Sequence, residues 1–313
     1  MHVSVELAKE RRLSARHQGV NLLEAMRPHH WTKNLLVFLF PAMHASTIGV
    51  DQWAAIFAVF VLFNACASGV YLFNDLADMH SDRQHDTKRH RPIASRELNT
   101  HVAFWAAVTL TSVSSAFAFA ISEPIGLLMV TYLFVATSYT LLLKRLIVID
   151  VGVLALKYCL RILAGAMVIG ASVPGWLIAY SFFFFLSLAC IKRHAELLRL
   201  KPGTFAAGRG YTRSHASVTR VWGHVSGAIS ASVLGGYAYL IQPQDGALFG
   251  VVLTLLSVQL LWMFRIWQQA DVQLFEADPV KFVLCDFPSQ IGFILCLILT
   301  LNLALEPLWI LKF

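Results

Sequence analysis

The chain has 313 residues, of which 57% are hydrophobic and only 14% are charged. Soluble domains contain about 25% charged residues, so this composition excludes an ordinary soluble globular protein. The formal net charge of +7 is accounted for by the basic loops of a membrane protein, and it gives no support for nucleic-acid binding.

Apolar stretches of about 20 residues recur along the chain, the length needed to cross about 30 Å of hydrocarbon. They predict an all-α, polytopic membrane protein with nine transmembrane helices. The spans are expected at 34–50, 53–73, 101–121, 124–143, 147–170, 173–191, 222–242, 247–266 and 284–305. Residues 1–30 are too charged for the apolar core of a signal peptide. The segment 1–26 is therefore predicted to be a basic cytoplasmic tail, and 27–313 one transmembrane domain.

The positions of the charges predict the orientation. Most of the 25 Lys and Arg residues lie in 1–33, 74–100, 144–146, 192–221 and 265–283, whereas the turns at 51–52, 122–123, 171–175 and 243–246 carry none. By the positive-inside rule the N-terminus and the polar loops face the cytoplasm. The predicted location is a bacterial-type cytoplasmic membrane, and the composition is compatible with a monomer or an oligomer.

The second span is followed by the run N-D-x-x-D-x-x-x-D at 74–82. Its carboxylates, Asp75, Asp78 and Asp82, fall on one face of a helix because 3.6 residues make a turn, and Asp86 extends the row. Carboxylate oxygens are the ligands that Mg²⁺ takes when it also binds substrate phosphates. The run therefore predicts a magnesium–diphosphate site. The alternative without a metal is an acidic helix end that forms salt bridges with a basic loop.

Basic residues surround this acidic row on both predicted cytoplasmic loops. The loop 74–100 adds Arg83, Lys88, Arg89 and Arg91 after Asn74, and the loop 192–221 carries Lys192, Arg193 and Tyr211, with Glu196 as its only carboxylate. Such cations suit a polyanionic ligand. For the second loop, a purely topological role is the alternative.

Charged residues also fall inside or beside the predicted spans. Asp150, Lys157 and Arg161 lie within about 40° on one face of a helix, and charges in a span normally face a cavity or a partner. The two cations are predicted either to reach a substrate phosphate or to form an internal ion pair. Lys33 and Asn34, before the first span, are placed to face the cytoplasmic mouth, or Lys33 serves only as an interfacial anchor.

These motifs resemble the UbiA superfamily of intramembrane prenyltransferases over nearly the whole chain. The runs R-P-H-H-W-T-K-N at 27–34, K-R-x-A-E at 192–196, L-R-I-L-A-G at 160–165 and E-A-D-P at 276–279 are similar to those of its decaprenyl-phosphate phosphoribosyltransferase branch. The resemblance implies a helical bundle around a central cavity open to the cytoplasm, and Mg²⁺ as cofactor. Prenyltransferases of the superfamily use a second aspartate-rich motif, in whose place this chain has Lys192, Arg193 and Glu196.

The resemblance implies two hypotheses, and a third belongs to another class of protein. In the first, phosphoribosyl pyrophosphate donates 5-phosphoribose to a polyprenyl phosphate, with its diphosphate on Mg²⁺ held by the three aspartates and its 5-phosphate among the basic residues of the loops. In the second, an isoprenoid diphosphate prenylates an aromatic or other small acceptor. The third is a transporter or lipid-binding protein without catalysis. It is disfavoured because the acidic row lies at the membrane surface and not at the midplane.

Overall fold

The computed structural model describes residues 17–85, 87–201, 203–206, 209–241, 246–272, 282 and 285–305. The regular elements among these residues are α-helices and 3₁₀ helices, with no strand, which confirms the predicted all-α class. The only extended pairing among them is a bridge between Phe205 and Thr212. The chain divides into two compact units. Unit 1 is formed by 1–34 and 60–141, and unit 2 by 35–59 and 142–313.

Unit 1 contains a helix at 17–26, most of α3 (Val50–Arg83), the 3₁₀ turn η2 (Lys88–His90), α4 (Thr100–Ile121) and α5 (Glu123–Leu141). The Asn99 side chain caps α4 by accepting a hydrogen bond from the His101 amide at 2.8 Å. Gly69 lets α3 approach α4 closely, because a Cβ there would lie 3.0 Å from the Ala107 carbonyl oxygen. Small residues therefore set the spacing of these two helices.

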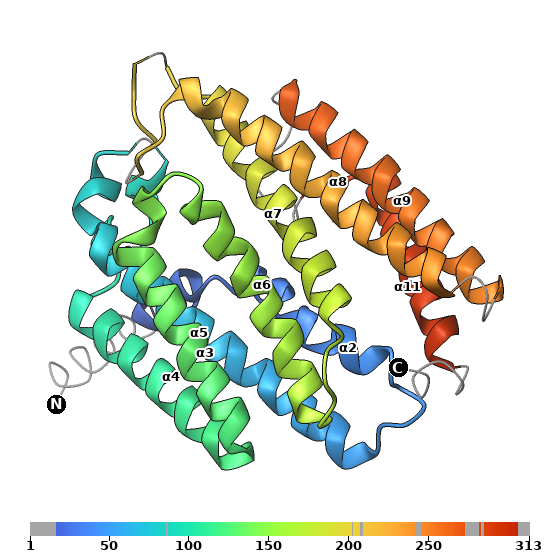
Figure 1. The fold of residues 1–313 in the computed structure, drawn as a ribbon. Coiled ribbons are helices and arrows are strands. Elements are labelled where there is room, and N and C mark those ends of the chain that lie inside the picture. The colour runs from blue at the N-terminus through green and yellow to red at the C-terminus, as the bar shows by residue number, and fades with distance from the viewer. Residues whose placement is uncertain are drawn as a thin grey trace, which may run out of the picture. The chain divides into compact units, whose positions relative to one another are not determined.

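Unit 2 contains α2 (Leu39–Ala42), α6 (Ile149–Val168), α7 (Gly175–Leu198), α8 (Ala216–Ile241), α9 (Gly246–Asp271) and α11 (Phe287–Leu305), with the 3₁₀ turns η3 (Leu143–Arg145) and η4 (Arg213–His215). Helices α6, α7, α8 and α9 pack in succession (Figure 1). One buried cluster joins α7 to α9, with Ile191 and Trp267 among its members.

Six helices in the described part of the chain are long and apolar enough to cross a membrane: Val50–Arg83, Thr100–Ile121, Glu123–Leu141, Ile149–Val168, Gly175–Leu198 and Leu248–Asp271. They cover six of the predicted spans. Helix α8 lies over the span predicted at 222–242, but Ser, Gly and His lower its mean hydropathy. Helix α11 covers most of the last span. The count of nine, the orientation and the central cavity stay predictions.

The structure differs from the sequence expectation at 34–50. In place of one α-helical span, a 3₁₀ helix, η1 (Pro28–Phe38), leads into the four residues of α2, and turns follow at 43–47. Pro41 cannot donate a backbone hydrogen bond, and the bonds after it run three residues back, from Met43 to Phe40 and from His44 to Pro41. The apolar composition indicated a span but carried no information on this tighter winding.

Candidate active site

The acidic row forms the last turns of α3, as its spacing predicted. Asp75 and Asp82 are buried, with 2% and 3% of their surface exposed, and Asp78 is half-buried. Seven residues of helix bring Asp75 and Asp82 to within about 20° of each other around the axis. The helix therefore presents these two carboxylates together.

Two arginines neutralise this pair. The Arg27 Nη2 atom donates to both carboxylate oxygens of Asp75, at 2.6 and 2.8 Å. The Arg91 Nη1 atom donates to Asp75 Oδ1 at 3.1 Å and to Asp82 Oδ2 at 2.7 Å. One nitrogen of Arg91 thus bridges two carboxylates. Charge-assisted contacts of this kind are about twice as strong as neutral ones, which explains how two acidic groups are buried side by side.

Arg27 is a site residue that the sequence analysis did not select. It lies between the helix at 17–26 and η1, in a left-handed conformation with φ of 56°, and its guanidinium stands over the Tyr71 ring at 5.3 Å. Its only sequence signal was its place at the start of the run 27–34. In that run, attention went to Lys33 and Asn34.

Two further residues of the run 27–34 are hydrogen-bonded to α3. Trp31 Nε1 donates to Ser68 Oγ at 3.0 Å, and Asn34 Nδ2 donates to Asn64 Oδ1 at 2.6 Å. Asn34 is 1% exposed, so its side chain is buried against α3. The sequence analysis instead expected this side chain to face the cytoplasmic mouth. Lys33 is half-buried, with its Nζ 3.4 Å from the nearest ring nitrogen of His30.

The loop after α3 folds back and brings Arg91 to the carboxylates. Arg83 Nε donates to the Ala94 carbonyl at 3.1 Å, which closes the loop. Lys88 is half-buried and Arg89 exposed, both within η2, and Asn74 is half-buried on α3. The position of Asp86 lies outside the described residues, as does the run 276–279.

A second charged cluster lies in unit 2. Arg193 of α7 contacts Asp150 of α6 through two nitrogens, at 2.7 and 2.6 Å, and it also bonds Glu196. Arg209 lies 3.4 Å from Glu196 and 4.0 Å from Asp150. Asp150 therefore has a close ion-pair partner on α7.

Tyr211 packs against this cluster and connects the loop 192–221 to the start of α6. Its ring faces the Arg193 guanidinium at 5.3 Å, and its hydroxyl accepts a hydrogen bond from the Val148 amide at 3.0 Å. Burial raises the pKa of Tyr211, and the Asp150 carboxylate adds to the effect. The hydroxyl therefore stays protonated at neutral pH.

The remaining predicted cations also belong to unit 2. Arg161 is 5% exposed, with its guanidinium over the Tyr158 ring at 5.7 Å and a hydrogen bond to the Lys157 carbonyl. Lys157 and Lys192 are half-buried. The aspartate row is in unit 1, so the meeting of the two sets of residues at one cavity stays a prediction.

A profile of the UbiA prenyltransferase family matches residues 35–275. The chain belongs to this family. It is 31% identical over 249 residues to the decaprenyl-phosphate phosphoribosyltransferase of Mycobacterium tuberculosis, covering 77% of this chain and 81% of that one. It is also 31% identical over 282 residues to the protein y4nM of Sinorhizobium fredii, covering 87% of this chain and 54% of the relative. The chain thus spans about half the length of y4nM.

The fold of the UbiA family is seen in solved structures as well. A UbiA homologue from Archaeoglobus fulgidus, bound to DMAPP and Mg²⁺, matches with a TM-score of 0.68 at 18% identity, covering 91% of this chain and 99% of that one. At this identity the likeness concerns the fold. It agrees with the predicted UbiA-like architecture.

The donor set of this UbiA family member suits a metal that is shared with a substrate. Within the described ranges, no group of three or more His, Cys, Asp or Glu side chains is placed to hold a metal ion. Asp75 and Asp82, however, both lie within 3.1 Å of one cationic nitrogen. Mg²⁺ is usually bound by one or two carboxylates together with substrate phosphates. The pair fits that mode, and it does not form an all-protein cage.

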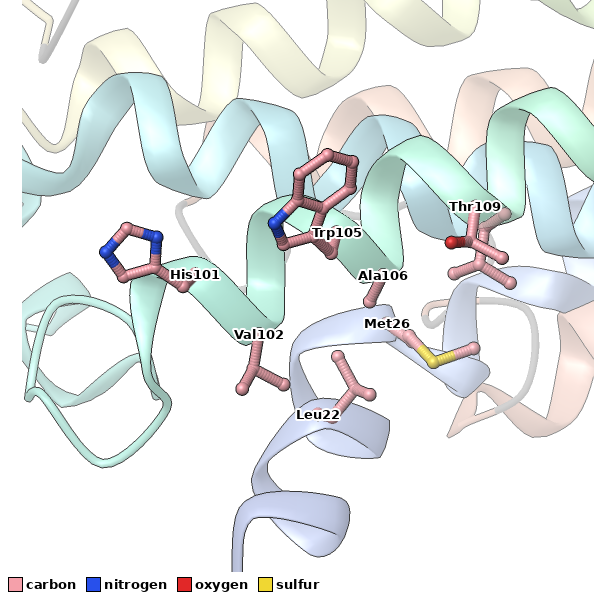
Figure 2. Close-up of a pocket in the computed structure, with 8 residues that line it drawn as sticks. Leu22, Met26, His101, Val102, Trp105, Ala106 and Thr109 are labelled. Atoms are coloured by element: carbon pink, nitrogen blue, oxygen red, sulfur yellow. The ribbon is translucent and has the colours of Figure 1, made fainter.

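An apolar groove lies in unit 1, between the helix at 17–26 and α4 (Figure 2). Its volume is about 610 Å³, and Trp105 on its wall is 64% exposed. The lining residues are Leu22, Met26, His101, Val102, Trp105, Ala106, Thr109 and Leu110. Such a lining suits an apolar chain better than a charged sugar. The residue that follows Met26 is Arg27, which contacts Asp75.

Proposed function

We propose that this protein is a magnesium-dependent membrane transferase that moves 5-phosphoribose from phosphoribosyl pyrophosphate to a polyprenyl phosphate. The observation that carries the proposal is the buried Asp75–Asp82 pair bridged by Arg91. It offers carboxylate oxygens for a metal and guanidinium groups for phosphates at one place. The relative from M. tuberculosis, named for this reaction, supports the choice of donor and acceptor.

In the reaction, the bond between C1 of the ribose and the pyrophosphate oxygen breaks, and an oxygen of the acceptor phosphate forms the new bond to C1. That phosphate is already ionised, so none of the chain's side chains needs to act as a general base. Mg²⁺ held by Asp75 and Asp82, with Asp78 as a further candidate ligand, would neutralise the charge that develops on the pyrophosphate. Arg27 keeps the Asp75 carboxylate oriented.

The 5-phosphate of the donor needs cations of its own. Lys88 and Arg89 in η2 and Lys192 of α7 are the candidates, because their positive charges suit a phosphate. Arg193 is less suited to this role than the sequence indicated, since Asp150 and Glu196 already engage its guanidinium.

A second candidate function is transfer of an isoprenoid from its diphosphate to a small acceptor. The family to which the chain belongs and the DMAPP-bound homologue favour it. The same carboxylate pair would then hold the isoprenoid diphosphate. The two functions differ in whether the sugar or the isoprenoid carries the diphosphate.

Purified protein with Mg²⁺, radiolabelled phosphoribosyl pyrophosphate and decaprenyl phosphate tests the proposal. We expect labelled phosphoribose in the lipid phase and an equal amount of pyrophosphate. Asp75→Asn should lower the rate about 10²–10³-fold, as the loss of an electrostatic contact to the transition state does. Asp51→Asn, an exposed position in the first turn of the same helix, is the matched control. Label transfer only from an isoprenoid diphosphate would favour the second function.

The proposed location is a bacterial-type cytoplasmic membrane with the acidic row facing the cytoplasm. Cysteines introduced singly at Arg96 and at Ser122, in a background without native cysteines, test this orientation. In intact cells a membrane-impermeant maleimide should label the position at 122 and spare the one at 96. The reverse pattern would contradict the orientation.

A further inference from the structure

The contact between Arg91 and the carboxylate pair has two properties that Arg27 lacks. Arg91 touches both aspartates with one nitrogen, whereas the described contacts of Arg27 with the pair are with Asp75 alone. The Arg91 side chain is also the more exposed, 26% against 17% for Arg27 and 2% for Asp75. Arg91 therefore occupies the space between the carboxylates and has a path to solvent.

A cation shared by the two aspartates would need this space. A metal ion held by both aspartates would need carboxylate oxygens such as Asp75 Oδ1 and Asp82 Oδ2. The Arg91 nitrogen already lies 3.1 and 2.7 Å from these same atoms. Two cations cannot share that position, because of their size and their like charge.

We propose that Arg91 is a latch that competes with the divalent cation for the Asp75–Asp82 pair. The latch rests on the proposed function, since it assumes that the pair holds a metal. In the metal-free protein the guanidinium neutralises the buried carboxylates and keeps them from repelling each other. When a metal binds, Arg91 leaves the pair, and its guanidinium becomes available to a phosphate of the donor.

The latch has a thermodynamic consequence. Metal binding without the donor must break two charge-assisted hydrogen bonds and leave Arg91 without its acidic partners. Donor phosphates give the displaced guanidinium new partners, so they remove part of this cost. By linkage, metal and diphosphate should each raise the affinity for the other. Arg91 is in this sense a positioning residue that couples the two ligands.

The first test is a titration of the full-length protein in detergent with Mn²⁺, followed by the EPR signal of the free ion, without any substrate. Arg91→Ala should bind Mn²⁺ about 10-fold to 100-fold more tightly than wild type, the range expected from a hydrogen bond between charged groups. Arg96→Ala removes the same charge from an exposed position of the same loop and serves as the control. Asp75→Asn shows whether the binding belongs to the pair.

The second test uses the unmodified protein, so that it does not depend on how a variant folds. A dicarbonyl reagent modifies accessible arginines, and mass spectrometry gives the rate for each site. Mg²⁺ alone should raise the rate at Arg91 and leave the rate at Arg96 unchanged. Addition of pyrophosphate together with Mg²⁺ should lower the rate at Arg91 again.

The outcomes separate the latch from the function on which it rests. Tighter Mn²⁺ binding in Arg91→Ala, together with faster Arg91 modification in Mg²⁺, supports the latch. Binding that requires Asp75 but is equal in Arg91→Ala and Arg96→Ala overturns the latch and leaves the metal site standing. Metal binding that is absent, or unaffected by Asp75→Asn, overturns both the latch and the magnesium role of the pair.

Discussion

The ion pair between Asp150 and Arg193 gives the sharpest prediction about stability. Both side chains are inaccessible, 0% and 1% exposed, and two arginine nitrogens lie 2.7 and 2.6 Å from one carboxylate oxygen. Removing one partner leaves the other charge buried, which typically costs about 3–5 kcal/mol. Arg193→Met should therefore lower the free energy of unfolding by about that amount, with the lower end favoured because Arg209 lies 4.0 Å from Asp150.

The assay is thermal unfolding in detergent, followed by the accessibility of buried cysteines to a fluorescent maleimide. For a protein of this size a loss of 3–5 kcal/mol corresponds to a fall in melting temperature of about 5–8 °C. The double variant Asp150→Leu/Arg193→Met removes both charges and should recover most of the loss, because an apolar pair of similar volume can replace a buried ion pair.

The same variants also test the role assigned to Arg193. If its guanidinium serves stability, phosphoribosyl pyrophosphate with Mg²⁺ should raise the melting temperatures of the double variant and of wild type equally. A single variant as stable as wild type would refute the reasoning about the ion pair. A stable double variant whose melting temperature is not raised by phosphoribosyl pyrophosphate would instead support a role for Arg193 in binding the donor's phosphate.

Two further predictions concern helix packing and a partly exposed ion pair. Gly69→Ala should destabilise the protein by about 1–3 kcal/mol through overpacking, because its Cβ would lie 2.7 Å from Thr111 Cγ2. In Gly236→Ala, the control, the new Cβ would have no neighbour within 4 Å. This variant should be neutral or stabilising in a thermal melt. Arg265 Nε and Nη2 donate to the Asp286 carboxylate at 3.0 and 2.7 Å. Because this ion pair is partly exposed, Asp286→Asn should lower the free energy of unfolding by no more than about 1 kcal/mol. A loss of several kcal/mol in chemical unfolding would contradict this assignment.

Local patterns predicted what depends on a single helix. The spacing of the acidic row required Asp75 and Asp82 to share a face, and α3 places them so, because helical periodicity acts over a few residues. Apolar length likewise predicted the helices that cover 101–121 and 124–143. At 34–50 the same criterion was misleading, since Pro41 changes the hydrogen bonding of an apolar segment without changing its composition.

Partners distant in sequence could not be predicted in the same way. Arg27 lies 48 residues from Asp75, and no local pattern connects them. Arg193 looked like a phosphate ligand because its loop is basic, but the fold pairs it with Asp150, 43 residues away. A basic residue near a predicted site has the same sequence signature whether its counter-ion is a substrate or a buried carboxylate.

The length of α3 has a consequence for where the two substrates can meet. Its 34 residues extend about 51 Å at 1.5 Å per residue, whereas the hydrocarbon layer is about 30 Å thick and the headgroups bring the bilayer to about 40–45 Å. If about 20 residues from Val50 cross the hydrocarbon, the row from Asp75 to Asp82 begins at the depth of the lipid headgroups and ends in water. The length of α3 thus sets the depth of the acidic row relative to the bilayer. Under the proposed function, a metal held by this row would then be within reach of both a phosphate anchored in the bilayer and a water-soluble donor, so neither substrate would have to leave its own phase.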